Sequence, residues 1–221
     1  MLKKKKGRLI VIEGIDGSGK ATQTKILLNH LKKNKIKCSS FSFPNYSTKY
    51  GKLIRKCLSG ELGSIDEVDP YYFASLYSED RKLASENIKK DLKNGKIVVI
   101  DRYAYSNFHQ MSKLPEKEQP AFLRWIIKNE FKNNKLPKED LLLYLYIPVK
   151  DVLRLIKKRS KNKKLDIHED NEKHLKDTQD IFLDQAKKNK SWHKIDCTKN
   201  NNVLSKKEIS SKINKIVEKI I

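Results

Sequence analysis

Gly14-Ile15-Asp16-Gly17-Ser18-Gly19-Lys20-Ala21-Thr22-Gln23 is the stretch that decides the predicted fold of this chain. It follows an apolar run at residues 9–12 and precedes a helical pattern that carries Leu27 and Leu31 on one side. A strand, a glycine-rich turn and a helix in this order are the context of a phosphate-binding P-loop. The glycines let the backbone turn tightly enough for successive N–H groups to point at phosphate oxygens, and the helix adds its positive end. We therefore predict a nucleotide phosphate site in this stretch.

The residues predicted to bind the nucleotide are the P-loop and the two residues after its lysine. Lys20 supplies a mobile cation for the transferred phosphoryl group. The usual pattern places Ser or Thr directly after this lysine to hold Mg²⁺, whereas this chain has Ala21 there and Thr22 one residue later. We predict that Thr22 or water replaces the missing hydroxyl at Mg²⁺. The nucleotide-binding set is Gly14, Ile15, Asp16, Gly17, Ser18, Gly19, Lys20, Ala21 and Thr22.

Length and charge set broad limits on the architecture and the partners. The 221 residues suffice for one sizeable α/β domain, and we expect residues 1–221 to form a single domain. A net charge of +22 is typical of proteins that bind nucleic acid or membranes. The lysines are spread along the whole chain, however, which favours a solvated basic surface over a nucleic-acid partner. The same positive field favours the binding of anionic nucleotides.

Cysteine usage and hydropathy indicate a cytoplasmic protein. Cys38, Cys57 and Cys197 are isolated in the sequence, which argues against a disulfide framework and against a structural zinc site. The lysine run at residues 3–6 is followed by a predicted strand that is too short for a signal-peptide core. No apolar run approaches the roughly 20 residues of a membrane-spanning helix, so we expect no membrane partner.

Apolar runs and turn signals alternate along the whole chain. Strands are predicted at 9–12, 36–43, 97–100, 141–147 and 192–197, and helices from residue 20, over 50–58, 70–94, 117–131, 148–159 and 166–189, and after a capping box at 205–208. Alternating strands and helices predict an α/β fold, with about five parallel strands wrapped by helices in a P-loop NTPase architecture. Ligands of such sheets bind beyond the carboxyl ends of the strands, where the P-loop, Pro44 and Asp101 all fall.

Asp101 and Arg102 stand at the carboxyl end of the predicted strand at 97–100. Asp101 is placed to hold Mg²⁺ through water or to orient the attacking group, and Arg102 offers two parallel donors to a phosphate. The alternative is an ordinary exposed pair, which the buried run before it disfavours. A P-loop alone fits a GTPase, an ATPase or a small-molecule kinase, so other motifs have to identify the acceptor.

Five motifs, in order along nearly the whole chain, resemble those of the thymidylate kinases. They are the P-loop with Asp16 at its third position and Thr22-Gln23 after the lysine; Phe43-Pro44 followed by Gly51; the segment DPYYFASLYSEDR at residues 69–81; Asp101-Arg102-Tyr103 followed by Ser106; and Asp166-Ile167-His168-Glu169. The resemblance implies a kinase that transfers a phosphoryl group from ATP to dTMP with Mg²⁺ as cofactor. It also implies a homodimer packed through helices.

The resemblance implies a role for each acceptor-site residue. Asp16 would bind the sugar 3′-hydroxyl, while the ring of Tyr103 would crowd out a 2′-hydroxyl. Tyr77 and Arg81 lie at i and i+4 on one helix face, which suits a ring stacked on the base and a guanidinium bonded to a base carbonyl. Arg102 would hold the acceptor phosphate. The substrate-binding set is Asp16, Phe43, Tyr77, Arg81, Arg102, Tyr103, Ser106 and Gln110, with His109 as a further candidate for the base edge.

Four of these residues also have an ordinary structural interpretation. Tyr77 fits a helix-core aromatic residue, and Arg81 fits an exposed charge on a helix. Phe43 fits simple core packing, and His109 fits a surface histidine. The sequence leaves these alternatives open.

Thymidylate kinases usually place an arginine in the P-loop or basic residues in a lid. Because Gly17 and Ser18 stand where a P-loop arginine would sit, a lid at about residues 157–167 has to contribute the cation. We predict Arg159 in this role, with Lys158, Lys161, Lys163 and Lys164 as alternatives. The predicted catalytic set is Lys20, Asp101, Arg102 and Arg159, and the predicted metal-binding residues are Thr22 and Asp101.

Two rival functions remain. The first is another P-loop nucleoside or nucleotide kinase with a different acceptor. Tyr77 and Arg81 favour a pyrimidine, and Arg102 favours an acceptor that already carries a phosphate. The second rival is a catalytically weak nucleotide-binding or nucleic-acid-binding protein, which Ala21 and the net charge favour. We predict phosphorylation of dTMP.

Overall fold

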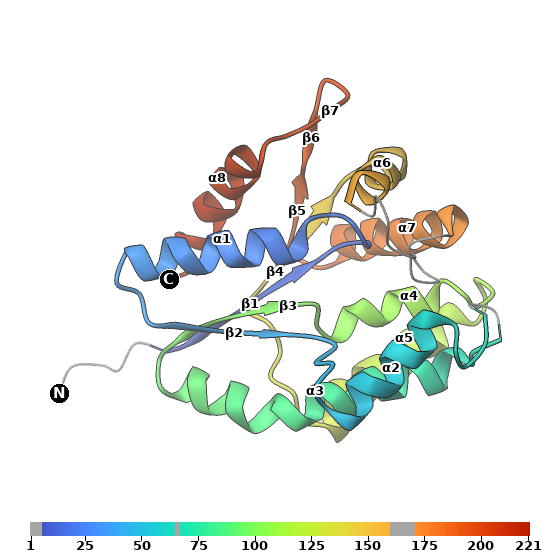
Figure 1. Ribbon diagram of the computed structural model, residues 1–221. Coiled ribbons are helices and arrows are strands. Elements are labelled where there is room, and N and C mark those ends of the chain that lie inside the picture. The colour runs from blue at the N-terminus through green and yellow to red at the C-terminus, as the bar shows by residue number, and fades with distance from the viewer. Residues whose placement is uncertain (1–5, 65–66, 160–170) are drawn as a thin grey trace.

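The computed structural model describes residues 6–64, 67–159 and 171–221. Its core is a five-stranded parallel sheet in the order β2-β3-β1-β4-β5, with helices on both faces (Figure 1). The strands are β1 (Arg8–Glu13), β2 (Cys38–Ser42), β3 (Ile97–Asp101), β4 (Leu141–Tyr146) and β5 (Trp192–Asp196). The α/β class and the five parallel strands predicted from the sequence are confirmed.

Most connections between strands contain a helix. The helices are α1 (Lys20–Lys33), α2 (Lys49–Ser59), α3 (Pro70–Lys93), α4 (Phe108–Met111), α5 (Gln119–Ile127), α6 (Val149–Arg159), α7 (Glu172–Lys188) and α8 (Lys206–Val217). Local signals set several of their ends. Asp69 accepts a hydrogen bond from the backbone N–H of Tyr72 at the start of α3, and Ser205 and Glu208 form the predicted capping box of α8.

The strands at the centre of the sheet are buried on both faces, as their continuous apolar sequences predict. Successive side chains of a strand point to opposite faces, so β1 contributes to two separate parts of the core. Ile10 packs in one cluster with Leu27 of α1 and residues of α6 and α8. Leu9 packs in the other with Ile88 of α3, Phe122 of α5 and residues of α7. This double burial fixes β1, and with it the start of the P-loop, at the centre of the sheet.

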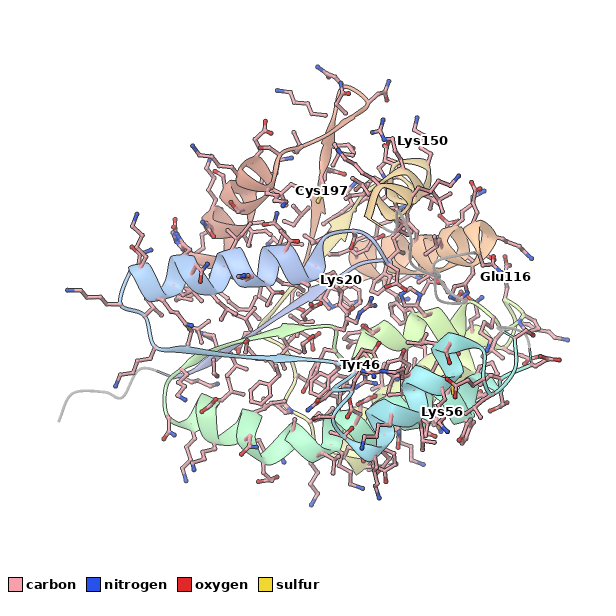
Figure 2. The ribbon with its side chains drawn as sticks, in the orientation of Figure 1. Lys20, Tyr46, Lys56, Glu116, Lys150 and Cys197 are labelled. Atoms are coloured by element: carbon pink, nitrogen blue, oxygen red, sulfur yellow. The ribbon has the colours of Figure 1, made fainter. Side chains whose placement is uncertain are left out.

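The strand register brings the site-bearing chain segments to one edge. Ile12 pairs with Asp101 across β1 and β3, and Ser42 pairs with the same Asp101 across β2 and β3. The P-loop after β1, the Phe43-Pro44 turn after β2 and the Asp101-Arg102 turn after β3 therefore leave the sheet side by side. Figure 2 shows Lys20 at this end of the sheet.

Three elements differ from the sequence-based expectation. The predicted helix at 117–131 is split, because α5 ends at Ile127 and continues as the π-helix η2 (Lys128–Asn133). The turn after Asp101 contains the 3₁₀ helix η1 (Ala104–Asn107) and the short α4. Neither was predicted, because the sequence shows no helical spacing of apolar residues there. Two-residue strands, β6 (Thr198–Lys199) and β7 (Asn202–Val203), form a small hairpin before α8.

Side chains that end in nitrogen or oxygen project around the outline of the molecule in Figure 2. Cys38, Cys57 and Cys197 are all free thiols. Within the described ranges, no helix is both long enough and apolar enough to cross a bilayer.

Candidate active site

The P-loop adopts the tight turn that its glycines predict. Gly14, Gly17 and Gly19 all have positive φ angles, of 152°, 80° and 90°. A side chain at Gly17 would also collide with α6, because a Cβ there would lie 2.8 Å from a carbon of Ile156. Glycine is therefore needed at this position both for the backbone angle and for the close approach of α6.

Lys20 begins α1 and points back into the loop. Its Nζ donates to the carbonyl oxygens of Gly14 (2.7 Å) and Ile15 (2.8 Å), and it lies 3.8 Å from an Asp16 carboxylate oxygen. Burial lowers the pKa of Lys20 to about 8, a net value that includes a smaller lowering by the nearby Arg102 cation and an opposing rise from Asp16. A phosphate that approaches this ammonium would favour its charged form.

The P-loop forms one wall of a cavity of about 610 Å³. Gly17 through Gln23 line it together with Asp101 and Arg102 at the sheet edge. Apolar side chains of α6, of the segment before α8 and of α8 itself complete the lining, namely Leu155, Ile156, Val203, Leu204 and Ile209. Backbone N–H groups and a lysine together with apolar side chains fit a nucleotide. We call this space the donor cavity.

Three buried oxygen atoms of the donor cavity wall have no hydrogen-bond partner among the described residues, and the side-chain oxygen of Gln23 is one of them. The Ser18 Oγ and one carboxylate oxygen of Asp101 are the other two. Oxygen donors of this kind suit Mg²⁺, which usually takes only one or two protein ligands alongside water and phosphate. The described part of the chain holds no cluster of three or more His, Cys, Asp or Glu side chains that could bind a metal.

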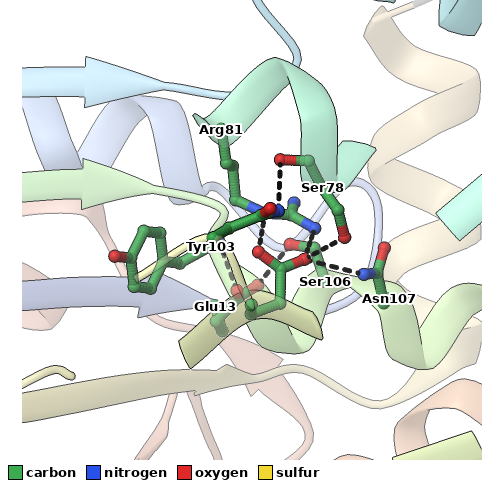
Figure 3. A network of polar contacts seen from close by, with 8 residues as sticks. Glu13, Ser78, Arg81, Tyr103, Ser106 and Asn107 are labelled. Carbon is green, nitrogen blue, oxygen red and sulfur yellow. Dashed lines mark hydrogen bonds and ion pairs between the residues drawn. The ribbon is translucent and has the colours of Figure 1, made fainter. Parts of the chain in front are cut away.

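Arg102 is held at the junction by an unusual backbone conformation. Its φ of 66° lies in the left-handed region, which a non-glycine residue adopts only when its surroundings impose it. The buried carboxylate of Glu13 supplies that constraint, because it accepts hydrogen bonds from the Tyr103 N–H (2.7 Å) and the Ser106 hydroxyl (2.7 Å). Figure 3 shows these two bonds beside Tyr103 and Ser106. Glu13 thus fixes the turn that aims Arg102.

The Arg102 side chain reaches the P-loop. Its Nη2 forms an ion pair with the Asp16 carboxylate, which is itself almost fully buried. Arg102 lines the donor cavity and also a second cavity of about 50 Å³ on the other side of the pair. The predicted phosphate-binding arginine therefore stands between two spaces, one on each side of the Asp16–Arg102 pair.

The second cavity, which we call the acceptor cavity, collects four of the predicted substrate-binding residues. Its lining consists of Asp16, Pro44, Tyr46, Leu58, Tyr77, Arg102, Ser106 and His109. Asp80 holds the wall that carries Tyr46, because its carboxylate accepts from the Asn45 N–H (2.7 Å) and the Thr48 hydroxyl (2.6 Å). Asp16, Tyr77, Arg102 and Ser106 are thus brought together, and His109 joins them.

The other predicted substrate-binding residues lie behind this lining. Phe43 is buried in the core, and Tyr103 is fully buried with its hydroxyl bonded to the Pro137 carbonyl oxygen (2.9 Å). Gln110 is buried and accepts a bond from Lys113. Arg81 is fully buried and forms an ion pair with Glu130, so the exposed-charge alternative does not describe it.

The predicted lid falls largely outside the described residues. Arg159 is the last residue of α6, and its side chain is outside the description, as are Lys161, Lys163, Lys164 and the motif at 166–169. Lys158 lies on α6 and is exposed. The roles proposed for these residues stay predictions.

Three buried polar residues of this region were not predicted from the sequence. Glu13 had a usable signal, because it is an acidic residue that ends an apolar strand directly before the P-loop. Glu130 and Asn107 had none. Both lie on short irregular helices and meet their partners only through tertiary contacts.

Replacing Glu13 by Gln is expected to make stability less dependent on pH. Burial raises the pKa of Glu13 to about 7 from an ordinary value of 4.5, against the lowering effect of its hydrogen bonds. A raised pKa stabilises the fold at low pH, and this contribution is lost as pH rises through about 7. The unfolding free energy of Glu13→Gln relative to wild type should therefore increase by roughly 2 to 3 kcal/mol between about pH 5 and pH 8.

Urea unfolding of both proteins across this pH range measures the effect, and every other titrating group is common to the two. A difference between them that stays constant with pH would contradict a raised pKa at Glu13.

Comparison with known proteins gives one consistent result. Residues 12–209 match the family model described as "Thymidylate kinase". A relative of that kind from Invertebrate iridescent virus 6 is 36% identical over 140 residues, which are 63% of this chain and 60% of the relative. "Thymidylate kinase" of Plasmodium falciparum (isolate 3D7) is 36% identical over 145 residues, 66% of this chain and 64% of the relative. The chain thus spans less than two thirds of the length of these two proteins.

A solved structure shares the fold. The thymidylate kinase from Candida albicans superposes with a TM-score of 0.78 over 97% of this chain and 92% of that one, at 24% sequence identity. This likeness supports the sheet order and the helical layers described above.

Proposed function

The chain belongs to the thymidylate kinase family, and we propose that it transfers the γ-phosphoryl group of ATP to dTMP, giving dTDP and ADP. One observation carries the proposal. The Asp16–Arg102 ion pair stands between a P-loop cavity and an acceptor cavity, and Arg102 lines both. A single arginine at that junction can contact a donor phosphate and an acceptor phosphate at once, which suits transfer between two phosphates.

The donor cavity suits the ATP phosphates. The P-loop N–H groups would cradle them, and Lys20 would exchange its bonds to the Gly14 and Ile15 carbonyl oxygens for phosphate oxygens. Its ammonium then neutralises charge as it develops on the transferred group. The apolar wall of α6 excludes water, so that the acceptor competes successfully with hydrolysis.

The acceptor cavity suits a nucleoside monophosphate. Arg102 would hold its phosphate with two parallel donors. Asp16 would accept from the sugar hydroxyl when Arg102 turns to the phosphate, and Tyr77 would offer its ring to the base. Alignment of donor and acceptor across the ion pair supplies most of the rate enhancement that such a reaction needs.

A panel of acceptors with ATP and Mg²⁺ tests the proposal. We expect dTMP to be the best substrate by kcat/KM among dTMP, dUMP, dCMP and thymidine. Arg102 would bind the phosphate of a monophosphate and has no such group to bind in thymidine. Coupled ADP formation measures each rate. Ready phosphorylation of thymidine without turnover of dTMP would contradict the proposal and favour a nucleoside kinase.

We also propose Mg²⁺ as the cofactor of this site, with Asp101 in its outer shell and Thr22 or water in place of the usual hydroxyl. The unpartnered Asp101 carboxylate oxygen and the position of Thr22 in the same cavity wall support it. When bound, Mg²⁺ supplies charge neutralisation between the phosphates. Asp101 and Thr22 would orient it at the sheet edge.

Restoring a hydroxyl next to Lys20 is expected to lower the Mg²⁺ concentration that the reaction needs. Ala21 lines the donor cavity, so Ala21→Ser places an oxygen where the family pattern has one. The Mg²⁺ concentration for half-maximal rate should fall roughly fivefold, about the worth of one polar contact. Ala121→Ser, on the exposed side of α5, is the matched control and should change nothing. An unchanged Mg²⁺ dependence in Ala21→Ser would contradict this assignment.

Four further features stay proposals, two of them from length, cysteine usage and hydropathy and two from the family resemblance. They are a single domain over residues 1–221, a lid at about 157–167 with Arg159 as its cation, a homodimer and a cytoplasmic location. Sedimentation velocity measures the oligomeric state directly.

A further inference from the structure

The buried carboxylate of Glu130 has no part in the mechanism above, yet it is the most heavily hydrogen-bonded group near the acceptor cavity. We propose that Glu130 is a positioning residue. It orients the hydrogen-bonding groups of Arg81 and Asn107 and thereby determines which pyrimidine base the acceptor site prefers. The inference rests on the proposed function, because it concerns the choice among pyrimidine monophosphates at the acceptor site.

Four hydrogen-bond donors converge on the Glu130 carboxylate, and Figure 3 labels the residues that supply them, Arg81, Ser78 and Asn107. Arg81 donates through Nη2 to one oxygen (2.5 Å) and through Nε to the other (3.2 Å). The Ser78 hydroxyl (2.5 Å) and the Asn107 side-chain amide nitrogen (3.2 Å) donate to the first oxygen. Glu130 and Arg81 are both fully buried.

The π-helix η2 aims Glu130 into this position. A π-helical turn shifts the side chains that follow out of the ordinary helical register, and such turns are frequent at functional sites. The Glu130 backbone is anchored as well, since its carbonyl oxygen accepts from the Leu136 N–H (3.1 Å). The carboxylate therefore sits on a fixed support and not on a mobile loop.

A carboxylate only accepts hydrogen bonds, and this fact orients both of its larger partners. Asn107 has to turn its amide nitrogen toward Glu130, which leaves its carbonyl oxygen on the other side. Arg81 uses Nε and Nη2, which leaves Nη1. Within the described residues, neither the Asn107 oxygen nor Arg81 Nη1 has a hydrogen-bond partner, although both are buried.

The residues that carry these two atoms adjoin two residues of the acceptor cavity lining. The Arg81 guanidinium carbon is 5.9 Å from the centre of the Tyr77 ring, and Asn107 follows Ser106 in the chain. Tyr77 and Ser106 both line the cavity. The cavity, at about 50 Å³, is far smaller than a nucleotide, so a bound nucleotide has to widen it.

A hydrogen-bond donor and an acceptor that both become available to the base on this side of the cavity would match one class of pyrimidine. Thymine and uracil present a carbonyl oxygen at position 4 and an N–H at position 3, which fit Arg81 Nη1 and the Asn107 oxygen. Cytosine presents an amino group and a bare nitrogen at these positions, so both contacts are mismatched. On this proposal the Glu130 carboxylate selects 4-oxo pyrimidines without touching the base.

The test replaces Glu130 by Gln, which has nearly the same shape. The new amide has to donate to one neighbour, and Asn107 is the one that can turn round to accept. We expect KM for dTMP to rise about tenfold or more with kcat changed less than about threefold, and the preference for dTMP over dCMP to fall at least about tenfold. KM for ATP should stay within about twofold of wild type.

Two further variants separate positioning from loss of structure. Asp140→Asn removes a carboxylate that likewise accepts from an arginine, Arg8 (2.8 Å), and from a backbone N–H, that of Leu9 (2.8 Å), at the far end of the sheet. It should lower the melting temperature without changing the dTMP preference. Asn107→Ala keeps the Glu130–Arg81 pair, so this variant should fold even if Glu130→Gln does not. Its preference for dTMP over dCMP should be lower than that of wild type.

Each outcome decides the question. If the wild type phosphorylates dTMP and the preference is unchanged in Glu130→Gln, or in Asn107→Ala where Glu130→Gln is unfolded, the positioning role is overturned and the proposed function stands. Equal losses with dTMP and dCMP would also overturn it. A wild type that does not phosphorylate dTMP overturns the proposed function itself.

Discussion

Replacing Lys20 by Met is expected to lower kcat about a thousandfold while leaving the protein folded. Lys20 is a buried cation of the donor cavity, and its Nζ donates hydrogen bonds to two carbonyl oxygens of the P-loop. In the reaction it would pass those bonds to phosphate oxygens and stabilise charge that exists only in the transition state. Met has a similar length and no charge, so that stabilisation is lost with little change in packing.

The measurement is steady-state kcat with saturating ATP and dTMP, together with a thermal melt. Lys25→Met is the matched control, because Lys25 lies on the exposed side of the same helix, α1. Burial of an ammonium is unfavourable, as the lowered pKa of Lys20 indicates, so Lys20→Met should melt no lower than wild type. Retention of more than about a tenth of wild-type kcat would contradict the assigned role of Lys20.

Replacing Arg102 by Lys is expected to lower kcat/KM for dTMP about a hundredfold. Arg102 holds Asp16 and lines both cavities, and a planar guanidinium can keep one contact while it forms another. A lysine ammonium is a point charge and cannot bridge the two spaces in this way. Arg124→Lys, at an exposed position of α5, is the control for the general effect of the exchange.

The dependence on substrate makes this result specific. The fall in kcat/KM should be much larger when dTMP is the varied substrate than when ATP is, because Lys20 and the P-loop still hold the donor phosphates. A loss of less than about threefold, or an equal rise in both KM values, would show that Arg102 does not select the acceptor.

The parts of the fold that follow local rules were predictable. The P-loop needs a strand, glycines and a helix in sequence, and residues 8–33 supply all three in order. The ends of α3 and α8 follow from Asp69-Pro70 and from the Ser205–Glu208 capping box. The break at η2 was missed, because a π-helical segment of six residues is too short to show an apolar period of its own in the sequence.

The site shows a similar division. Asp101, Arg102 and the P-loop are placed by the ends of parallel strands, so their meeting follows from the sheet. The Arg81–Glu130 pair joins residues 49 positions apart, and neither of the two interpretations of Arg81, a base contact or an exposed charge, contained a buried partner. Charge pairs of this kind depend on how α3 and η2 pack together, which periodicity does not encode.

Product analysis with ATP radiolabelled in its γ-phosphate tests the central claim most directly. We predict that wild-type protein moves the label from ATP to the β-position of dTDP, with one ADP formed for each dTDP, and that Lys20→Met forms neither product at a comparable rate. Label that appears only in inorganic phosphate, or that enters thymidine but not dTMP, would contradict phosphoryl transfer across the Asp16–Arg102 pair.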